Sequence, residues 1–151
     1  MNTLSRNLHG ARYNVFEALC SDGIAACQVY RNTGNLETLL DFVLYHLLPV
    51  MNPYPLPNSV LLLDNVKIHL ACNDLLTKLC KTRGVLVRFL PTYSPDMNPI
   101  ELMFNVAKSS IRRDYIQLRD HDEPGEEIKN FFAKIGTRQN AAEWFRHAGY
   151  K

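Results

Sequence analysis

The chain has 151 residues, of which 46% are hydrophobic and 21% charged, as expected for one soluble globular domain with a single core. No apolar run approaches the roughly 18 residues that span a membrane, and the first residues lack a signal-peptide core, so we expect neither membrane insertion nor secretion. We expect a nuclear protein if the host is eukaryotic and a cytoplasmic one otherwise. The four cysteines form no Cys-x-x-Cys pair, which favours a reducing compartment over a disulfide framework.

The charge is unevenly distributed along the chain. The net charge of +2 alone does not indicate a nucleic-acid partner. Residues 67–88 carry five bases and one acid, and residues 105–119 carry four bases and one acid. Residues 120–127 carry five acids and no base. The sequence therefore predicts a basic centre followed by an acidic linker, although either basic segment alone would suit an ordinary solvated surface.

The first half of the chain predicts a β-hairpin followed by a helix. Residues 1–11 are polar and without a pattern, and we expect no strand there. Residues 12–19 and 24–30 are rich in β-formers and are joined by the turn Ser21-Asp22-Gly23. Asn35 is placed to cap a helix in which leucines and a valine recur at helical spacing through Leu47. A loop with four prolines follows.

The second half predicts a parallel β-α-β unit and further helices. Residues 59–63 are expected to form a buried strand, residues 70–82 a helix ended by Gly84, and residues 85–90 a second strand. This succession is typical of a crossover between parallel strands. We then expect a helix over residues 99–113 and two short helices over 126–135 and 140–147. The predicted fold class is α/β, with the hairpin before the parallel unit and no second domain.

Asp64 and Glu101 are the candidate catalytic and metal-binding residues. Asp64 follows the first parallel strand, and 36 residues separate it from Glu101, enough for a helix, a strand and a return loop. Both acids are then expected at the carboxyl edge of the sheet, where open α/β sheets bind ligands. Two carboxylates there could hold Mg²⁺ or Mn²⁺ for phosphoryl transfer. Purely structural roles remain open: Asp64 could begin a turn with Asn65, and Glu101 could complete a capping box with Asn98.

Several basic and polar residues near these acids are candidates for nucleic-acid binding. On the predicted helix, Glu101 shares a face with cations, whereas apolar residues from Ile100 to Ile111 cover the other side, a pattern equally expected of any amphipathic helix. His69 could approach phosphate or be structural, and Tyr93 could stack on a base or pack in its loop. Trp144 and Phe145 are expected to anchor the last helix. The nucleic-acid candidates are Lys67, His69, Tyr93, Asn105, Lys108, Arg112 and Arg113.

At the two acidic motifs, the sequence resembles the catalytic domain of mariner-type (Tc/mariner superfamily) DDE transposases, a resemblance that runs from about Gly10 to the C-terminus. The matching pieces are Leu63-Asp64-Asn65 with His69, Leu90-Pro91, Tyr93-Ser94-Pro95-Asp96, Asn98-Pro99-Ile100-Glu101, Phe104, Lys108, Arg112 and the ending His147-Ala148-Gly149-Tyr150. The resemblance implies an RNase H-like mixed sheet flanked by helices, divalent metal, and cutting and joining of DNA. It also implies that Asp64 and Glu101 are the second and third acids of a catalytic triad.

The chain departs from that family at its start. The resemblance implies an N-terminal helix-turn-helix domain, for which there is no room, and a first acid at the end of a central strand ahead of the hairpin. Residues 1–11 contain no acid, Asp22 lies in the hairpin turn, and Asp41 lies within a helix. We therefore expect the central strand to be missing, and the two exposed strand edges to leave a fold of marginal stability or one completed by another polypeptide.

These observations predict a polar segment over 1–11, a partial DDE catalytic domain over 12–119, an acidic linker over 120–127 and a C-terminal helical extension over 128–151. The predicted function is that of a DDE-type transposase or endonuclease domain that lacks its first catalytic Asp. The alternatives are a non-catalytic DNA- or protein-binding remnant and an unexpressed gene fragment. Expected partners are DNA and a second copy or a fuller transposase copy.

Overall fold

A three-stranded antiparallel sheet begins the fold in the computed structural model, which describes residues 2–8, 11–31, 34–64, 73–91, 94–113 and 121–150. Its strands are β1 (Asn2–Leu8), β2 (Ala11–Cys20) and β3 (Gly23–Arg31), in the order β1-β2-β3. The hairpin predicted over residues 12–30 is therefore confirmed. Its turn requires Gly23, whose φ is +125° and where an added Cβ would lie 2.7 Å from the Gly136 carbonyl oxygen.

Strand β1 corrects the expectation that residues 1–11 have no regular structure. It pairs with β2 from Asn2 opposite Glu17 to Leu8 opposite Ala11. Main-chain hydrogen bonds along β2 can hold a neighbouring strand whatever its side chains, so a polar sequence without a hydrophobic pattern gave no sign of it. The strand, with sequence NTLSRNL, contains neither Asp nor Glu.

The helical segment that follows β3 is irregular. It comprises α1 (Leu36–Asp41), a π-helical stretch (Phe42–Leu47) and a 3-10 turn (Leu48–Val50). The predicted cap is confirmed, because the Asn35 side chain accepts a hydrogen bond of 2.9 Å from the Thr38 N–H. Pro49, which has no N–H to donate, lies in the final turn. Helical spacing of apolar residues thus predicted a helix but not its change of winding.

The predicted β-α-β crossover is also confirmed. Strands β4 (Val60–Leu63) and β5 (Leu86–Phe89) are parallel, with Val60 opposite Leu86, and α3 (Asn73–Lys81) connects them. Gly84 ends the connection at a φ of +70°, the left-handed region that suits glycine, and its N–H donates to the Lys81 carbonyl oxygen at 3.0 Å. Residues 65–72, which include the predicted start of this helix, lie outside the described residues.

The remaining elements are helical: a 3-10 turn (Pro95–Met97), α4 (Pro99–Arg113), α6 (Pro124–Ile135) and α7 (Arg138–His147). Helix α4 begins at Pro99, as predicted. Helix α6 starts earlier than predicted, so residues 124–127 of the expected acidic linker form its first turn, where Glu126 and Glu127 lie at the positive end of the helix dipole.

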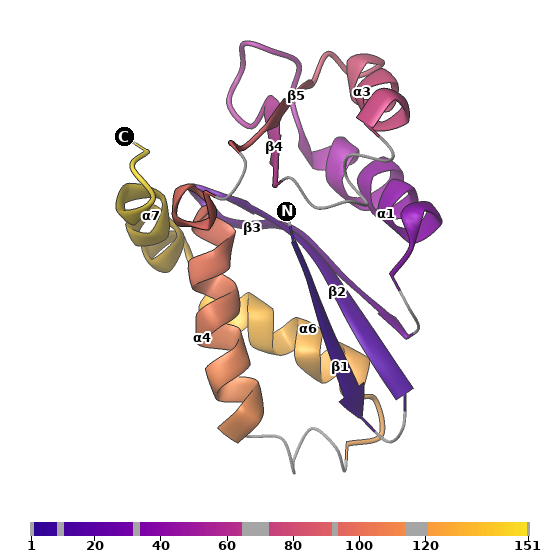
Figure 1. The fold of residues 1–151 in the computed structure, drawn as a ribbon, viewed down its shortest axis with the longest axis vertical. Coiled ribbons are helices and arrows are strands. Elements are labelled where there is room, and N and C mark those ends of the chain that lie inside the picture. Colours follow the sequence, from indigo (N-terminus) through magenta and orange to yellow (C-terminus); the bar gives the residue numbers. More distant parts are fainter. Residues whose placement is uncertain are drawn as a thin grey trace.

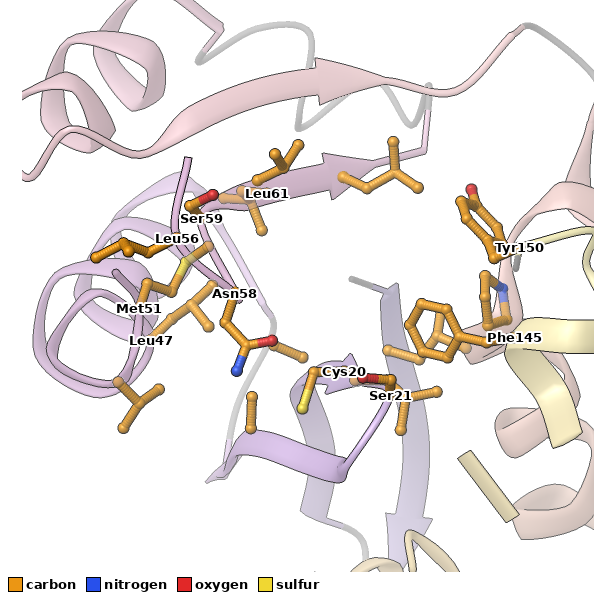
Figure 2. Close-up of a pocket in the computed structure, with 18 of the residues that line it drawn as sticks. Cys20, Ser21, Leu47, Met51, Leu56, Asn58, Ser59, Leu61, Phe145 and Tyr150 are labelled. Carbon is orange, nitrogen blue, oxygen red and sulfur yellow. The ribbon is translucent and has the colours of Figure 1, made fainter. Parts of the chain in front are cut away.

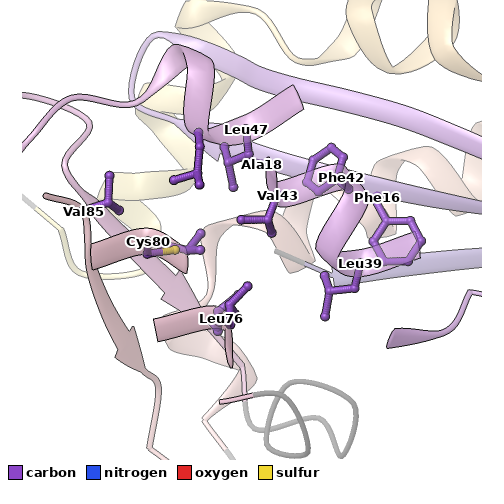
Figure 3. Packing of buried hydrophobic residues seen from close by; sticks show 12 residues of the cluster. Phe16, Ala18, Leu39, Phe42, Val43, Leu47, Leu76, Cys80 and Val85 are labelled. Carbon is purple, nitrogen blue, oxygen red and sulfur yellow. The ribbon is translucent and has the colours of Figure 1, made fainter. Parts of the chain in front are cut away.

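Strand β2 lies between two hydrophobic clusters, because its successive side chains point to opposite faces of the sheet. Phe16 and Ala18 pack with α1, the π-helical stretch, β4 and α3 in the first cluster, which Figure 3 shows. Tyr13 and Val15 pack on the other face against α4 and α6. In Figure 1, α4, α6 and α7 gather on one side of the three-stranded sheet, whereas α1, α3 and the parallel strands lie on its other side. The predicted α/β class is thus confirmed, and Ile128 and Phe132 of α6 are buried in the second cluster.

No helix within the described parts of the chain is both long and apolar enough to cross a bilayer.

Candidate functional site

Asp64 follows directly on the last residue of β4. The neighbouring strand β5 is parallel to β4, and the Leu90 N–H just beyond it donates a hydrogen bond of 2.8 Å to the Leu63 carbonyl oxygen. The ladder is therefore intact up to Asp64. One carboxylate oxygen of Asp64, Oδ1, is buried. The predicted position of this acid, at the carboxyl end of a parallel strand, is the one found.

Glu101 is the third residue of α4 and is partly buried. Its N–H donates to the Asn98 carbonyl oxygen at 3.1 Å, and the Asn98 N–H donates to the Pro95 carbonyl oxygen at 3.1 Å. A capping box would use the Glu101 carboxylate to accept from that Asn98 N–H, which already has an acceptor in Pro95. An acid in this first turn also suits the helix dipole, so a structural role for Glu101 stays compatible with its position.

The segments that precede the two acids line one cavity of about 520 Å³. Leu61 and Leu62 of β4 contribute to its wall, as do Asn98, Pro99 and Ile100 at the start of α4. Figure 2 shows the cavity, with Leu47 and Met51 on one side and Phe145 and Tyr150 on the other. The fold thus brings the end of β4 and the beginning of α4 to one region, although neither acid lines the cavity itself.

The described residues contain no group of three or more His, Cys, Asp or Glu side chains arranged to hold a metal ion. Asp22, in the hairpin turn, forms an ion pair of 3.2 Å with Arg138 of α7, and Asp41 is the exposed last residue of α1. Both acids therefore have the positions that the sequence predicted, one in the hairpin turn and one in α1.

The polar face of α4 has the predicted composition. Asn105, Arg112 and Arg113 are exposed, and Lys108 is partly buried. The opposite face is buried, with Ile100, Met103, Phe104, Ala107 and Ile111 each at most 2% exposed. A helix held by one face presents its cations on the other, where they can meet phosphate. The remaining nucleic-acid candidates, Lys67, His69 and Tyr93, lie outside the described residues.

Glu17 is a titratable residue that the sequence reasoning did not single out. Its side chain is 0% exposed, and the Cys27 thiol, directly opposite in β3, is its polar neighbour. Burial raises the pKa of this carboxyl group to about 8, because the low-dielectric interior disfavours the charged form. Glu17 falls in phase with Tyr13 and Val15 on the β2 face that α4 and α6 cover, so the strand alternation was the signal that could have found it.

Comparison with known proteins gives one family. The sequence matches the family described as DDE superfamily endonuclease over residues 2–122, from β1 to just before α6. No curated protein and no solved structure matches the chain significantly. Members of this family act on DNA and generally depend on divalent metal ions. Since the match covers more than half of the chain, the protein belongs to the DDE superfamily endonuclease family.

Proposed function

We propose that this chain is a mariner-type transposase catalytic domain with an RNase H-like architecture, in which Asp64 and Glu101 are two of the carboxylates that serve DNA strand cleavage and transfer. The observation that carries the proposal is the position of the two acids in a chain of this family. Asp64 directly follows the first of two parallel strands, and Glu101 lies in the first turn of the helix α4 that comes after the second strand. Parallel strands end at the same edge, so a DNA phosphate could approach both carboxylates.

The donor chemistry of this pair fits Mg²⁺ or Mn²⁺. Both ions prefer oxygen ligands, and Mg²⁺ commonly binds through one or two carboxylates completed by water and substrate phosphate. Asp64 would contribute a buried carboxylate oxygen, and Glu101 a partly exposed carboxylate. When bound, the metal would activate a water or hydroxyl nucleophile and stabilise charge on the leaving oxygen. Lys108 and Arg112, along the same helix, would hold the DNA backbone in place.

The test is metal-dependent nicking of supercoiled DNA by the purified chain. We expect nicking that requires Mg²⁺ or Mn²⁺ and is reduced at least about a hundredfold by Asp64→Asn or Glu101→Gln, as for loss of a group that acts in the transition state. The matched controls are Asp74→Asn and Glu37→Gln, because both residues also lie in the first turn of a helix, α3 and α1 respectively. Nicking that survives both site substitutions, or falls equally in the controls, would contradict the assignment of the acids.

A non-catalytic remnant that binds DNA is the second candidate. It is favoured by the absence of an acid from β1 and by the lack of a three-residue metal cluster among the described residues. In this case the chain binds DNA in a salt-sensitive way, nicks none at any metal concentration, and keeps its affinity in Asp64→Asn and Glu101→Gln. This outcome would also support the view that the catalytic site is incomplete, with the first acid lost or supplied by a fuller transposase copy.

A further inference from the structure

The proline-rich loop before β4, residues 51–58, presents an exposed tyrosine on a main chain that is held in place. The Tyr54 N–H donates a hydrogen bond of 2.9 Å to the Gly84 carbonyl oxygen. The Asn52 side chain closes the loop, because its Nδ2 donates to the Pro57 carbonyl oxygen at 2.7 Å. Tyr54 is nevertheless 59% exposed, and no aromatic ring of the described residues packs against it. A ring presented on an ordered loop loses little conformational freedom when it binds a partner.

Basic side chains lie on the turn to which this loop is bonded. Gly84 belongs to the turn between α3 and β5, which Figure 1 shows beside the loop that leads into β4. Residues 42–63 and 75–90, which contain the loop and the turn, include four Lys and Arg residues and no Asp or Glu. The two segments therefore form a positively charged surface that contains an aromatic ring. We name it the loop–turn surface, and its exposed residues are Tyr54, Lys78, Lys81 and Arg83.

The end of α3 closes on its own main chain. The Gly84 N–H donates to the Lys81 carbonyl oxygen and the Val85 N–H to the Cys80 carbonyl oxygen, each at 3.0 Å. Cations in the last turn of a helix also suit its dipole, so the charges alone would fit a structural role. The exposed Tyr54 ring beside them is the feature that indicates a ligand.

The loop–turn surface lies at the opposite end of the parallel strands from Asp64. Where the loop and the turn enter β4 and β5, the Leu86 N–H donates to the Ser59 carbonyl oxygen at 2.9 Å. Asp64 follows the other end of β4. The four residues of β4, at about 3.3 Å each, separate the two ends by roughly 13 Å. The loop–turn surface is therefore distinct from the end of the sheet that carries this candidate acid.

We propose that the loop–turn surface binds single-stranded DNA, with a base stacked on the Tyr54 ring and neighbouring phosphates beside Lys81 and Arg83. Sites that bind single strands without sequence preference combine cations with aromatic rings, because every base has a flat face and every nucleotide a phosphate. Duplex DNA fits this surface less well, since its bases are stacked on one another and expose only their edges. DNA is also the polyanion on which the family acts. The proposal does not depend on the catalytic assignment of Asp64 and Glu101.

The experiment is a fluorescence anisotropy titration of the whole chain with a fluorescein-labelled strand of twelve deoxythymidines, in EDTA so that no metal-dependent cleavage occurs. We expect saturable binding that weakens with salt. Tyr54→Ala should weaken it at least about fivefold, the lower limit for loss of one stacked base, whereas Tyr54→Phe keeps the ring and should stay within about twofold. The matched control is Tyr45→Ala, which removes a 66% exposed ring from the π-helical stretch and should also stay within about twofold.

Charge variants test the phosphate contacts. Lys81→Gln and Arg83→Gln should each reduce the slope of log affinity against log salt by about 0.7, the value for one phosphate of a single strand. Lys134→Gln, at an exposed position on α6, should leave the slope unchanged. Binding of a duplex of twelve base pairs should stay within about twofold in Tyr54→Ala, because paired bases cannot stack on the ring.

Four results would overturn the proposal. These are absence of saturable binding, a loss in Tyr54→Ala no larger than in Tyr45→Ala, equally weak binding by Tyr54→Phe and Tyr54→Ala, and an equal loss for duplex and single strand. Binding to phosphatidylserine vesicles that Tyr54→Ala abolishes, with single-strand binding unchanged, would also overturn it, because the partner would then be a membrane surface. Failure of the chain to nick DNA would leave these expectations as they stand, since the titration contains no metal.

Discussion

The side-chain hydroxyl group of Tyr150 donates a hydrogen bond of 3.0 Å to the main-chain carbonyl oxygen of Met97. Met97 ends the 3-10 turn that leads into α4, and the Tyr150 ring packs edge-on against Phe145 of α7 with centroids 5.6 Å apart. The C-terminal end of the chain therefore holds the turn that sets where α4 and Glu101 begin. Residues beyond the family match thus help to position a candidate site within it.

Tyr150→Phe tests this link. The substitution keeps the ring and removes the hydroxyl group, so we expect a loss of about 0.5–1.5 kcal/mol in the free energy of unfolding, the usual range for one hydrogen bond. Hydrogen exchange should accelerate at the Met97 and Asn98 amides. The control is Tyr45→Phe, because Tyr45 is 66% exposed. If exchange in the turn before α4 is unchanged, the C-terminal end does not hold it.

Burial of Glu17 predicts that stability falls as the pH rises from 4.5 to about 8. Its carboxyl pKa is about 8 in the folded chain against an ordinary value of 4.5, so between these pH values the folded state keeps a proton that the unfolded state releases. The stabilisation that comes from the protonated Glu17 carboxyl group is fully present below pH 4.5. It is lost as the pH rises through about 8, by at most about 1.4 kcal/mol per pH unit. Urea unfolding followed from about pH 5 to pH 9 measures this slope.

Glu17→Gln removes the titrating group while keeping its shape, and should flatten that slope. The control Glu37→Gln, at an exposed position, should leave it in place. If the free energy of unfolding depends on pH as steeply in Glu17→Gln as in the wild type, other groups cause the pH dependence.

Phe104 and Phe132 test whether the C-terminal helices share the core of the domain. Their rings meet edge-on with centroids 5.8 Å apart and join α4 to α6. Phe132 is 0% exposed, so Phe132→Ala should lower the free energy of unfolding by about 3–5 kcal/mol, from lost burial and the cavity left behind. Val106→Ala, at a 43% exposed position on α4, should stay within about 0.5 kcal/mol. A small effect at Phe132 would mean that α6 is an independent appendage.

The basic face of α4 predicts a salt-dependent contribution to DNA binding. If Arg112 contacts one phosphate, Arg112→Gln should weaken binding to all sequences alike and reduce the slope of log affinity against log salt by about 1. Arg138→Gln makes the same charge change on α7, where the arginine is 82% exposed and pairs with Asp22. Affinity measured at several salt concentrations should separate the two variants. Equal slopes would remove Arg112 from the DNA interface.

Local sequence patterns determined most of the elements of this protein. Apolar residues at helical spacing predicted α4 and its start at Pro99, and the succession of strand, helix and strand predicted a parallel pair whose carboxyl end carries Asp64. Asn35 marked the start of α1 through a capping box that involves only residues three positions apart. These features are predictable because the interactions that make them connect residues close in the chain, or follow from a fixed repeat.

The remaining features depend on contacts between distant parts of the chain, which only the tertiary structure decided. Strand β1 exists because β2 offers it a main-chain edge, and its own polar sequence carries no sign of pairing. The Glu17 pKa is raised because α4 and α6 cover the face of β2 on which Glu17 lies. The sequence around Glu17 would be the same if that face were exposed to water, so the sequence alone does not predict the raised pKa. The cavity beside β4 likewise arises where β2, β4, α4 and α7 meet. The sequence determined which residues can bear the chemistry, and long-range packing determined their surroundings.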